Sequence, residues 1–249
     1  MSAKTKDNSN MMTKEDREKK IDNTKPTGDK SLRKDYRYDM KAIYANKSMA
    51  YKIVKRAFDI VSSGLALVVL SPVFLITAIA IKLEDGGPVF FHADRFGKDM
   101  SRFKMHKFRS MIVDPDGSKL RELMKKNEMD GHTFKIKDDP RITKVGRFIR
   151  KTSIDELPQL WNIFVGEMSV VGPRPIITFD MSEWDDYDMQ RWVVQPGLTC
   201  IWQISGRADV SWEEWVEMDF DYIEKMSVGE DLKLIFGTFP AVLKGEGAY

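Results

Sequence analysis

One stretch of this chain carries no charged side chain over 22 consecutive residues, from Ile60 to Ile81. A helix needs roughly 20 apolar residues to cross the hydrocarbon core of a bilayer, so this stretch is long enough. A helix of this length in the core of a soluble protein normally keeps a polar face, which this one lacks. The stretch therefore predicts a helix inserted into a membrane, and it restricts the chain to folds that lie against a bilayer.

A proline interrupts the middle of this segment, in the dipeptide Ser71-Pro72. Proline removes one helical hydrogen bond and clashes with the preceding turn, so we expect a kink there, with the Ser71 hydroxyl satisfying a freed backbone group. Both flanks are basic, with Lys52, Lys55 and Arg56 before the segment and Lys82 after it. This charge pattern does not single out an outer end. Two topologies remain open: a kinked spanning helix, and a re-entrant hairpin with both ends on one side.

Charge is balanced overall but unevenly distributed. Lys and Arg total 40 and Asp and Glu 38, which gives no reason to expect a nucleic-acid partner. Residues 1–50 hold 13 basic and 8 acidic residues, a net charge of +5, and the remainder carries −3. Residues 1–37 lack the apolar core of a signal peptide, so we interpret residues 1–50 as a disordered, polar and basic tail. Such a tail either contacts anionic lipid or stays in solvent.

Beyond the tail we predict a membrane helix at 51–85 and a catalytic domain at 86–249. The domain is expected to be mainly α-helical with a small β-hairpin, formed by the β-like runs 88–91 and 103–108. Residues 118–129 are expected to form a largely charged helix, apolar periodicity predicts helices at 142–150 and 211–226, and start and stop signals predict one at 155–164. The aromatic face of 211–226 suits a membrane interface or an ordinary core, and 232–243 is a second candidate for lying on the lipid surface. The single Cys200 excludes an intrachain disulfide framework and fits a reducing compartment. One Cys and three scattered His cannot form a Cys/His metal site.

Two neighbouring acids, Asp155 and Glu156, stand at a predicted helix start. Pro158 fits a helix only within about the first turn, and Ser153 with Glu156 has the spacing of a capping box. Five bases precede the pair: Arg141, Lys144, Arg147, Arg150 and Lys151. Acids among bases suit phosphate chemistry with a metal ion, one carboxylate attacking phosphorus and the other holding a divalent cation. The alternative is structural, because acids in a first turn often only stabilise the helix dipole.

Two later segments bring further arginines. Two prolines hold Arg174 in the segment 170–175, which we expect to be a rigid, irregular loop that presents the guanidinium to a phosphate. A second loop, 195–207, is rich in turn formers and ends in Arg207. Four aspartates that follow are expected to be solvated or capping residues rather than ligands: Asp209, Asp219, Asp221 and Asp231.

Seven or more short motifs appear in a fixed order along about Lys55 to Gly247. They are Lys55-Arg56-Ala57-Phe58-Asp59, Ser71-Pro72, Lys107-Phe108-Arg109-Ser110-Met111, Asp139-Pro140-Arg141-Ile142-Thr143, Ser153 to Gln159, Gly172 to Pro175, Pro196-Gly197-Leu198-Thr199 and Gln203 to Arg207. In these residues the chain resembles the bacterial polyprenyl-phosphate glycosyl-1-phosphate transferases of the small, monotopic kind, the bacterial sugar transferases. It differs at Ser110, where that family often has Thr, and at Cys200, where Gly is frequent.

The resemblance implies a monotopic membrane protein of the bacterial cytoplasmic (inner) membrane. Its re-entrant helix hairpin would bend at Ser71-Pro72, with amphipathic helices at the interface and the catalytic domain on the cytoplasmic face. The implied reaction moves a sugar-1-phosphate from a UDP-sugar to undecaprenyl phosphate, releases UMP and requires Mg²⁺. It would be the first membrane step of exopolysaccharide, capsule, O-antigen or glycoprotein glycan assembly.

By the same resemblance, Asp155 is the nucleophile and Glu156 the Mg²⁺ ligand. The expected phosphate- and substrate-binding residues are Lys107, Arg109, Arg150, Pro173, Arg174, Gln203 and Arg207. Several cations are also required on physical grounds, because two anionic substrates and a carboxylate repel one another strongly in a protected site. The sequence does not identify the sugar, and a homodimer or downstream glycosyltransferases remain open as partners.

Two other functions compete with this interpretation. The first is a catalytically silent membrane scaffold for a glycan-assembly complex, for which loss of the acid pair or of Arg174 would be typical, yet both are present. The second is a glycoside hydrolase. Adjacent residues of one helix rarely place two carboxyl groups across a glycosidic bond at the required separation of roughly 5–10 Å, and the basic surroundings also disfavour it.

Overall fold

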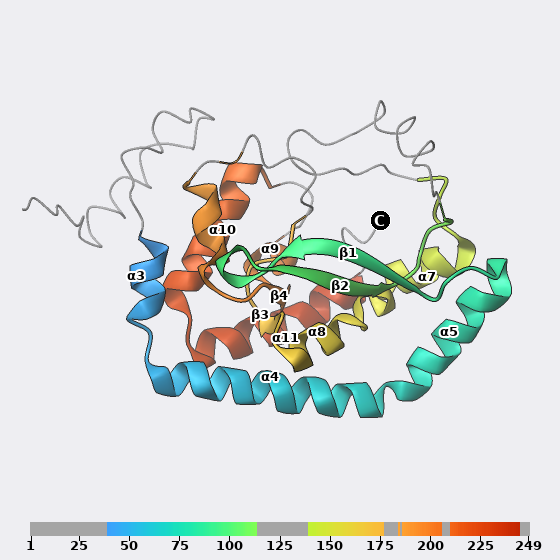
Figure 1. Ribbon diagram of the computed structural model, residues 1–249, viewed down its shortest axis with the longest axis horizontal. Coiled ribbons are helices and arrows are strands. Elements are labelled where there is room, and N and C mark those ends of the chain that lie inside the picture. Colours follow the sequence, from blue (N-terminus) through green and yellow to red (C-terminus); the bar gives the residue numbers. More distant parts are fainter. Residues whose placement is uncertain (1–38, 114–138, 177–183, 185, 206–209, 245–249) are drawn as a thin grey trace, which may run out of the picture. The chain divides into compact units, whose positions relative to one another are not determined.

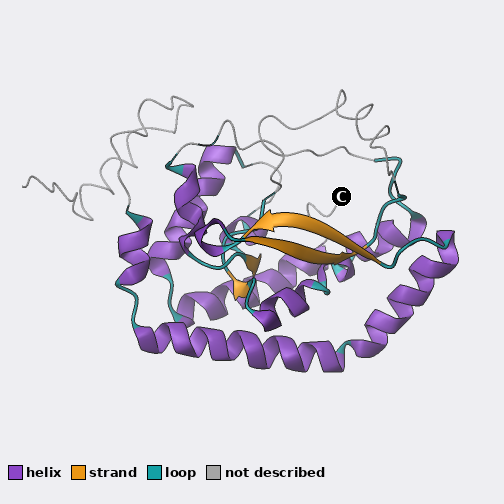
Figure 2. Ribbon diagram, viewed as in Figure 1, coloured by secondary structure: helices purple, strands orange, loops and turns teal. Residues whose placement is uncertain are grey.

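The computed structural model describes residues 39–113, 139–176, 184, 186–205 and 210–244. Over these residues the chain is mainly helical with two small β-sheets (Figure 1), which confirms the predicted composition of the fold. The predicted tail up to residue 38, the helix at 118–129, Arg207 and Asp209 lie outside the described residues. Figure 2 shows the elements by type: α3 (Met40–Ala45), α4 (Met49–Val69), α5 (Ser71–Asp85), β1 (Phe90–Phe96), η1 (Lys98–Met100), β2 (Arg102–Phe108), α7 (Lys144–Lys151), η2 (Ile154–Glu156), α8 (Gln159–Val165), β3 (Ser169–Val171), η3 (Asp188–Val193), β4 (Gly197–Thr199), α9 (Ile201–Ile204), α10 (Trp212–Lys225) and α11 (Val228–Lys244).

Helices α4 and α5 meet at Leu70 and bend by 59°. Pro72 lies in the first turn of α5, where a missing backbone donor costs nothing, and the Ser71 hydroxyl donates to the carbonyl of Val68 over 2.8 Å. The predicted kink is therefore confirmed, together with the role of Ser71 in satisfying the freed carbonyl. Among the described helices none is alone long and apolar enough to cross a bilayer, whereas α4 and α5 together meet that test.

Large apolar side chains stay exposed along this bent pair. Examples are Val68 at 72% exposure in α4 and Ile76 at 68% in α5. Further exposed apolar side chains lie on α8 and α11, among them Trp161, Phe236 and Phe239. Soluble monomers rarely expose so many large apolar groups on neighbouring elements, so these helices present a surface suited to lipid.

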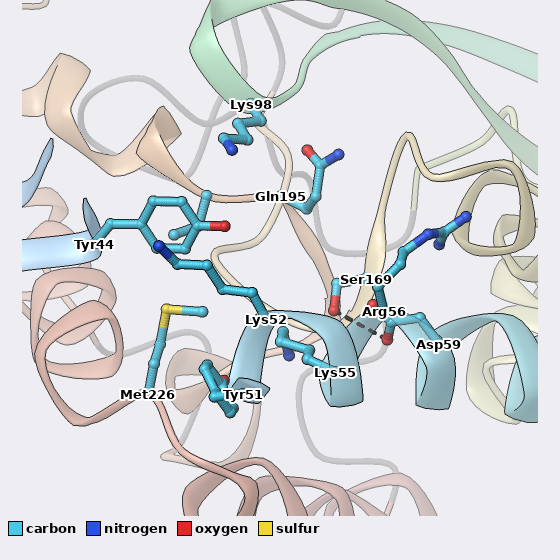
Figure 3. Close-up of a pocket in the computed structure, with 11 residues that line it drawn as sticks. Tyr44, Tyr51, Lys52, Lys55, Arg56, Asp59, Lys98, Ser169, Gln195 and Met226 are labelled. Atoms are coloured by element: carbon cyan, nitrogen blue, oxygen red, sulfur yellow. Dashed lines mark hydrogen bonds between the residues drawn. The ribbon is translucent and has the colours of Figure 1, made fainter. Parts of the chain in front are cut away.

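Three polar residues on one face of α4 attach this helix to three different elements. Lys55 forms an ion pair with Asp231 of α11 over 3.0 Å. Arg56 donates to the last carbonyls of α8, those of Ile163 and Phe164, over 2.7 and 2.8 Å. Asp59, which is 3% exposed, accepts hydrogen bonds from β3 (Figure 3). The polar face of α4 is thus bonded to the protein while its other face remains apolar and exposed.

The β1–β2 hairpin is antiparallel, with Phe90 opposite Phe108 and Phe96 opposite Arg102. Because side chains alternate along a strand, one face of this hairpin is apolar and packs against α8. The buried residues of this contact are Ala93, Phe103, Met105, Leu160, Ile163 and Met168. Lys107 belongs to the same face, which directs it towards the segment before α8.

Strands β3 and β4 are parallel, with Ser169 opposite Gly197 and Val171 opposite Thr199. The segments that follow β3 and precede β4 pass so closely that a Cβ atom on Gly172 would lie 2.3 Å from the carbonyl oxygen of Gln195. This sheet corrects two predictions: residues 170–171 form part of a strand, and the expected loop 195–207 contains β4 and α9. Strands of three residues are too short to produce a recognisable alternation.

Two of the aspartates predicted to be solvated or capping are buried. Asp219 is 2% exposed and forms an ion pair with Arg191, and Asp231 accepts hydrogen bonds from Tyr51 and Tyr222 as well as Lys55. The prediction was wrong for these two because the amphipathic pattern does not reveal a buried partner. Asp221 is exposed beside Lys225, as expected.

Candidate active site

The acid pair lies in a single turn of 3-10 helix, η2, between α7 and α8. Ser153 precedes it in the left-handed conformation, with φ of 56° and ψ of 16°, which residues with side chains rarely adopt. The predicted capping box is wrong, because Ser153 makes no side-chain cap and Glu156 binds two cations instead. The predicted helix 155–164 is likewise replaced by η2 and by α8, which begins after Pro158.

Glu156 lies between two cations. Lys107 Nζ donates to Glu156 Oε1 over 2.9 Å, and Arg174 donates from Nη2 to Oε1 over 2.5 Å and from Nη1 to Oε2 over 3.4 Å. Burial alone would raise the pKa of Glu156, but the charges and hydrogen bonds of Arg174 and Lys107 hold it well below its usual range. Glu156 is therefore a stable carboxylate with most of its lone pairs occupied.

Asp155 differs from Glu156 in both its hydrogen bonding and its pKa. None of the described residues donates a hydrogen bond to its carboxylate or pairs with it at contact distance. Burial, together with the neighbouring charge of Glu156, raises the pKa of Asp155 to about 6, against the opposing charges of Lys107, Arg150 and Arg174. A carboxylate with free oxygens and a raised pKa is a better nucleophile than one that is fully hydrogen-bonded.

The loop after β3 fixes the backbone of Arg174. Pro173 is buried, and its carbonyl accepts a hydrogen bond from the backbone N–H of Gly197 over 2.8 Å. The carbonyl of Arg174 accepts from Nη2 of Arg191 over 3.2 Å, and its guanidinium lies 5.9 Å from the ring centroid of Trp202. The rigid presentation expected for Arg174 is therefore provided, although one of its supports, Arg191, was missed because no motif or periodicity marks it.

The remaining candidates occupy different surroundings. Arg109 is bound by the carboxylate of Asp85 through both terminal nitrogens and by the carbonyl of Pro88 through Nε, so its donors serve the end of α5. Arg150, in the last turn of α7, lies near enough for its charge to lower the pKa of Asp155. Gln203 is buried in α9, where Oε1 accepts from Cys200 Sγ. The structure thus gathers Lys107, Arg150 and Arg174 around the acid pair, and directs Arg109 elsewhere.

The carboxylates of Asp155 and Glu156 can supply only part of the coordination shell of a metal ion. No group of three or more His, Cys, Asp or Glu side chains suited to a metal occurs within the described ranges. Mg²⁺, however, is commonly held by one or two carboxylates, with water and substrate phosphates completing its shell. Asp155 has free oxygens, and Glu156 uses three of about four lone-pair positions. The pair therefore fits a Mg²⁺ ion shared with a phosphate, and does not fit an ion held by protein alone.

A separate pocket of about 200 Å³ lies beside the first half of α4 (Figure 3). Its lining includes the α4 anchors Lys55, Arg56 and Asp59, together with Lys52 and Lys98. Neither member of the acid pair contributes to it. The pocket marks the junction of α4 with β3 and is distinct from the acid pair.

Comparison with known proteins supports a specific family. Residues 50–245 match the family model described as bacterial sugar transferase. The chain is 39% identical over 230 residues to a UDP-galactose-lipid carrier transferase of Erwinia amylovora, covering 86% of this chain and 48% of that protein. It is 44% identical over 201 residues to the exopolysaccharide production protein ExoY of Sinorhizobium fredii, covering 79% and 88%. An undecaprenyl-phosphate galactose phosphotransferase of Salmonella typhimurium is 38% identical over 230 residues, covering 86% and 48%. The chain thus spans about half the length of the first and third relatives and most of the second.

Proposed function

The chain belongs to the bacterial sugar transferase family, and we propose that it transfers a sugar-1-phosphate from a UDP-sugar to undecaprenyl phosphate, releasing UMP. The names of the relatives support both substrates, since they refer to a UDP-sugar, to a lipid carrier and to undecaprenyl phosphate. The product, undecaprenyl-diphosphate-sugar, would begin a surface glycan such as an exopolysaccharide, as the name of ExoY suggests.

The observation that carries this proposal is the contrast between the two acids. Asp155 has free oxygens and a raised pKa, whereas Glu156 is locked as an anion between Lys107 and Arg174. Neighbouring carboxyl groups whose environments separate their pKa values usually have separate roles. We assign attack on phosphorus to Asp155, and we assign to Glu156 the positioning of two cations and of a Mg²⁺ ion.

In the first step, a carboxylate oxygen of Asp155 forms a bond to the phosphorus that carries the sugar. The bond from that phosphorus to the bridging oxygen breaks, and UMP leaves with the electron pair. In the second step, an oxygen of the lipid phosphate attacks the same phosphorus and the Asp155 carboxylate leaves. The covalent route lets a water-soluble donor and a lipid acceptor use one site in turn.

Lys107 and Arg174 have a clear role in both steps. Their charges already face Glu156, so a phosphate beside that carboxylate meets two donors whose positions are fixed by β2 and by the loop after β3. Preorganised cations stabilise the charge on the transferring phosphoryl group without rearranging during the reaction. Mg²⁺, when bound at Glu156, would further screen the phosphate charge and bring donor and carboxylate together.

We further propose that α4 and α5 form a re-entrant hairpin, with the catalytic domain on the cytoplasmic face. The bend of 59°, the exposed apolar side chains on α4, α5, α8 and α11, and the bonding of α4's polar face to the domain support this placement. Cysteines at exposed Ser48 and Leu83 test it in intact cells. Labelling from the cytoplasmic side alone is expected, and labelling of one position from outside would show a spanning helix.

The reaction itself is tested with Asp155→Asn in detergent, using a panel of UDP-sugars, undecaprenyl phosphate and Mg²⁺. The wild-type protein should release UMP and, with donor alone, carry a covalent phosphosugar detectable by intact mass. Asp155→Asn should do neither, while Asp221→Asn, an exposed control, should behave as wild type. Near wild-type turnover by Asp155→Asn would remove the nucleophile assignment. A wild-type protein inactive with every donor would favour a catalytically silent scaffold.

A further inference from the structure

Arg95 differs from four other arginines that the structure describes. Arg109, Arg141, Arg174 and Arg191 each have a carboxylate partner: Asp85, Asp139, Glu156 and Asp219. Among the described residues none provides Arg95 with such a partner, and its one hydrogen bond runs from Nη1 to the backbone carbonyl of Asp94 over 2.7 Å. Its Nε is shut off from solvent and lacks an acceptor. Leaving a buried donor unmatched costs about 1–3 kcal/mol, more for a charged group, so the feature requires an explanation.

The donors left over on Arg95 have a particular geometry. One N–H of Nη1 is engaged, and the N–H groups of Nε and Nη2 that point in parallel from one edge of the guanidinium have no acceptor among the described residues. This edge is one of the two forks with which arginine binds a carboxylate or a phosphate through two hydrogen bonds. The free part of Arg95 is therefore suited to a tetrahedral oxyanion.

The position of Arg95 places this fork beside the proposed site. Arg95 lies on the same face of the hairpin as Lys107, because it is four residues along β1 from Phe91, the partner of Lys107. Burial and the nearby charge of Arg174 lower the pKa of Arg95 to about 10, so the two guanidinium groups repel each other. Asp94 opposes this only weakly. The next residue, Phe96, packs against Trp192 of the aromatic cluster that includes Trp202.

The distribution of charged side chains at the site also favours an anionic ligand for Arg95. Lys107 and Arg174 share the carboxylate of Glu156, whereas among the described residues no carboxylate forms an ion pair with Arg95. An anionic substrate that enters the site would supply the missing charge.

We propose that Arg95 binds the phosphate of the departing nucleoside monophosphate through Nε and Nη2. This inference rests on the proposed function. When the bond between the two donor phosphates breaks, negative charge grows on the oxygen that leaves with UMP, and a cation at that phosphate favours its departure. Arg174 and Lys107 hold the phosphate that is transferred, and Arg95 holds the one that leaves. Arg95 is therefore a substrate-binding residue of the first step, with no part in the second.

Binding of UMP and of uridine to the full-length protein in detergent tests the assignment. Arg95→Met keeps the aliphatic length and removes the fork, and Arg102→Met is the control, an exposed arginine of the same hairpin. Losing charged hydrogen bonds should weaken UMP binding about tenfold to a hundredfold in Arg95→Met, with uridine binding unchanged. Arg102→Met should bind both as wild type does. Unchanged UMP binding by Arg95→Met, or an equal loss for uridine, would overturn the inference.

Two further readouts separate a binding role from a structural one. Since Arg95→Met removes an unpaired cation, its melting temperature should equal or exceed that of the wild type, and a clear decrease would indicate a structural role instead. In single-turnover assays the variant should form the covalent adduct more slowly, yet pass the sugar phosphate from a preformed adduct to undecaprenyl phosphate at the wild-type rate. A wild-type protein that releases no UMP from any donor would instead contradict the proposed function.

Discussion

The attachment of α4 to β3 makes a quantitative prediction for Asp59. Its Oδ1 accepts two hydrogen bonds, from the Ser169 hydroxyl over 3.1 Å and from the backbone N–H of Val170 over 2.9 Å. Asp59→Ala would leave both donors without an acceptor in a region where Ser169 is 1% exposed. Each stranded donor costs about 1–3 kcal/mol, so we expect a loss of roughly 2–6 kcal/mol in the free energy of unfolding.

Asp59→Asn provides the matched comparison. The amide keeps an oxygen where Oδ1 lies, so both hydrogen bonds can persist, and only their charge assistance is lost. We therefore expect this variant to lose less than half as much stability as Asp59→Ala. For a domain of 150–250 residues each kcal/mol corresponds to about 2–4 °C, which predicts a decrease in melting temperature of roughly 4–24 °C for Asp59→Ala.

Thermal unfolding followed by intrinsic tryptophan fluorescence, in one detergent and at one protein concentration, measures both variants. Asp221→Ala serves as control, since its exposed pair with Lys225 should contribute no more than about 0.5 kcal/mol. If Asp59→Asn melted as low as Asp59→Ala, the negative charge rather than the two hydrogen bonds would hold α4 to β3. If Asp59→Ala melted within a degree of the wild type, the attachment would not stabilise the fold at all.

Three shorter predictions concern the site. The nucleophile must be ionised, and the pKa of Asp155 is about 6 without a metal, so the rate of UMP release should rise as the pH increases. The inflection should lie no higher than about pH 6, because a bound cation favours the carboxylate. An inflection above pH 7 would contradict this assignment. Glu156→Gln should need a higher Mg²⁺ concentration for half-maximal UMP release and should turn over more slowly, and an unchanged Mg²⁺ titration would count against the ligand role. Gly172→Ala should lower stability by about 3 kcal/mol or more, because its Cβ would lie 2.3 Å from a carbonyl oxygen of Gln195; a melting curve like that of the wild type would show that β3 and β4 can separate without cost.

Patterns that extend over many residues were predictable from the sequence. The kink at Ser71-Pro72, the hairpin and the helix α7 follow from proline chemistry and from alternation or helical spacing of apolar side chains. The proximity of Lys107 and Arg174 to the acid pair was expected only through family resemblance. Their distances from Glu156 depend on how β2 and the loop after β3 are packed, which no local pattern encodes.

The errors share a physical cause. The capping box at Ser153 was a local prediction, and tertiary contacts replaced it, because two cations bind Glu156 more strongly than a backbone amide would. The burial of Asp219 and the unmatched fork of Arg95 likewise depend on neighbours far away in the sequence. The sequence does contain a true capping box, at Ser211 and Glu214, and none of the described Lys or Arg side chains forms an ion pair with Glu214 at contact distance.

The three polar residues that attach α4 to α11, α8 and β3 also couple the position of α4 to that of β3. Arg174 follows β3 by three residues, so a force that shifts α4 acts on the strand that leads directly into the loop of Arg174. If α4 and α5 insert as the proposed re-entrant hairpin, bilayers of different thickness will draw the pair to different depths. Turnover in nanodiscs should therefore depend on acyl-chain length. Asp59→Ala should make turnover less sensitive to that length, because the variant lacks the hydrogen bonds that connect α4 to β3.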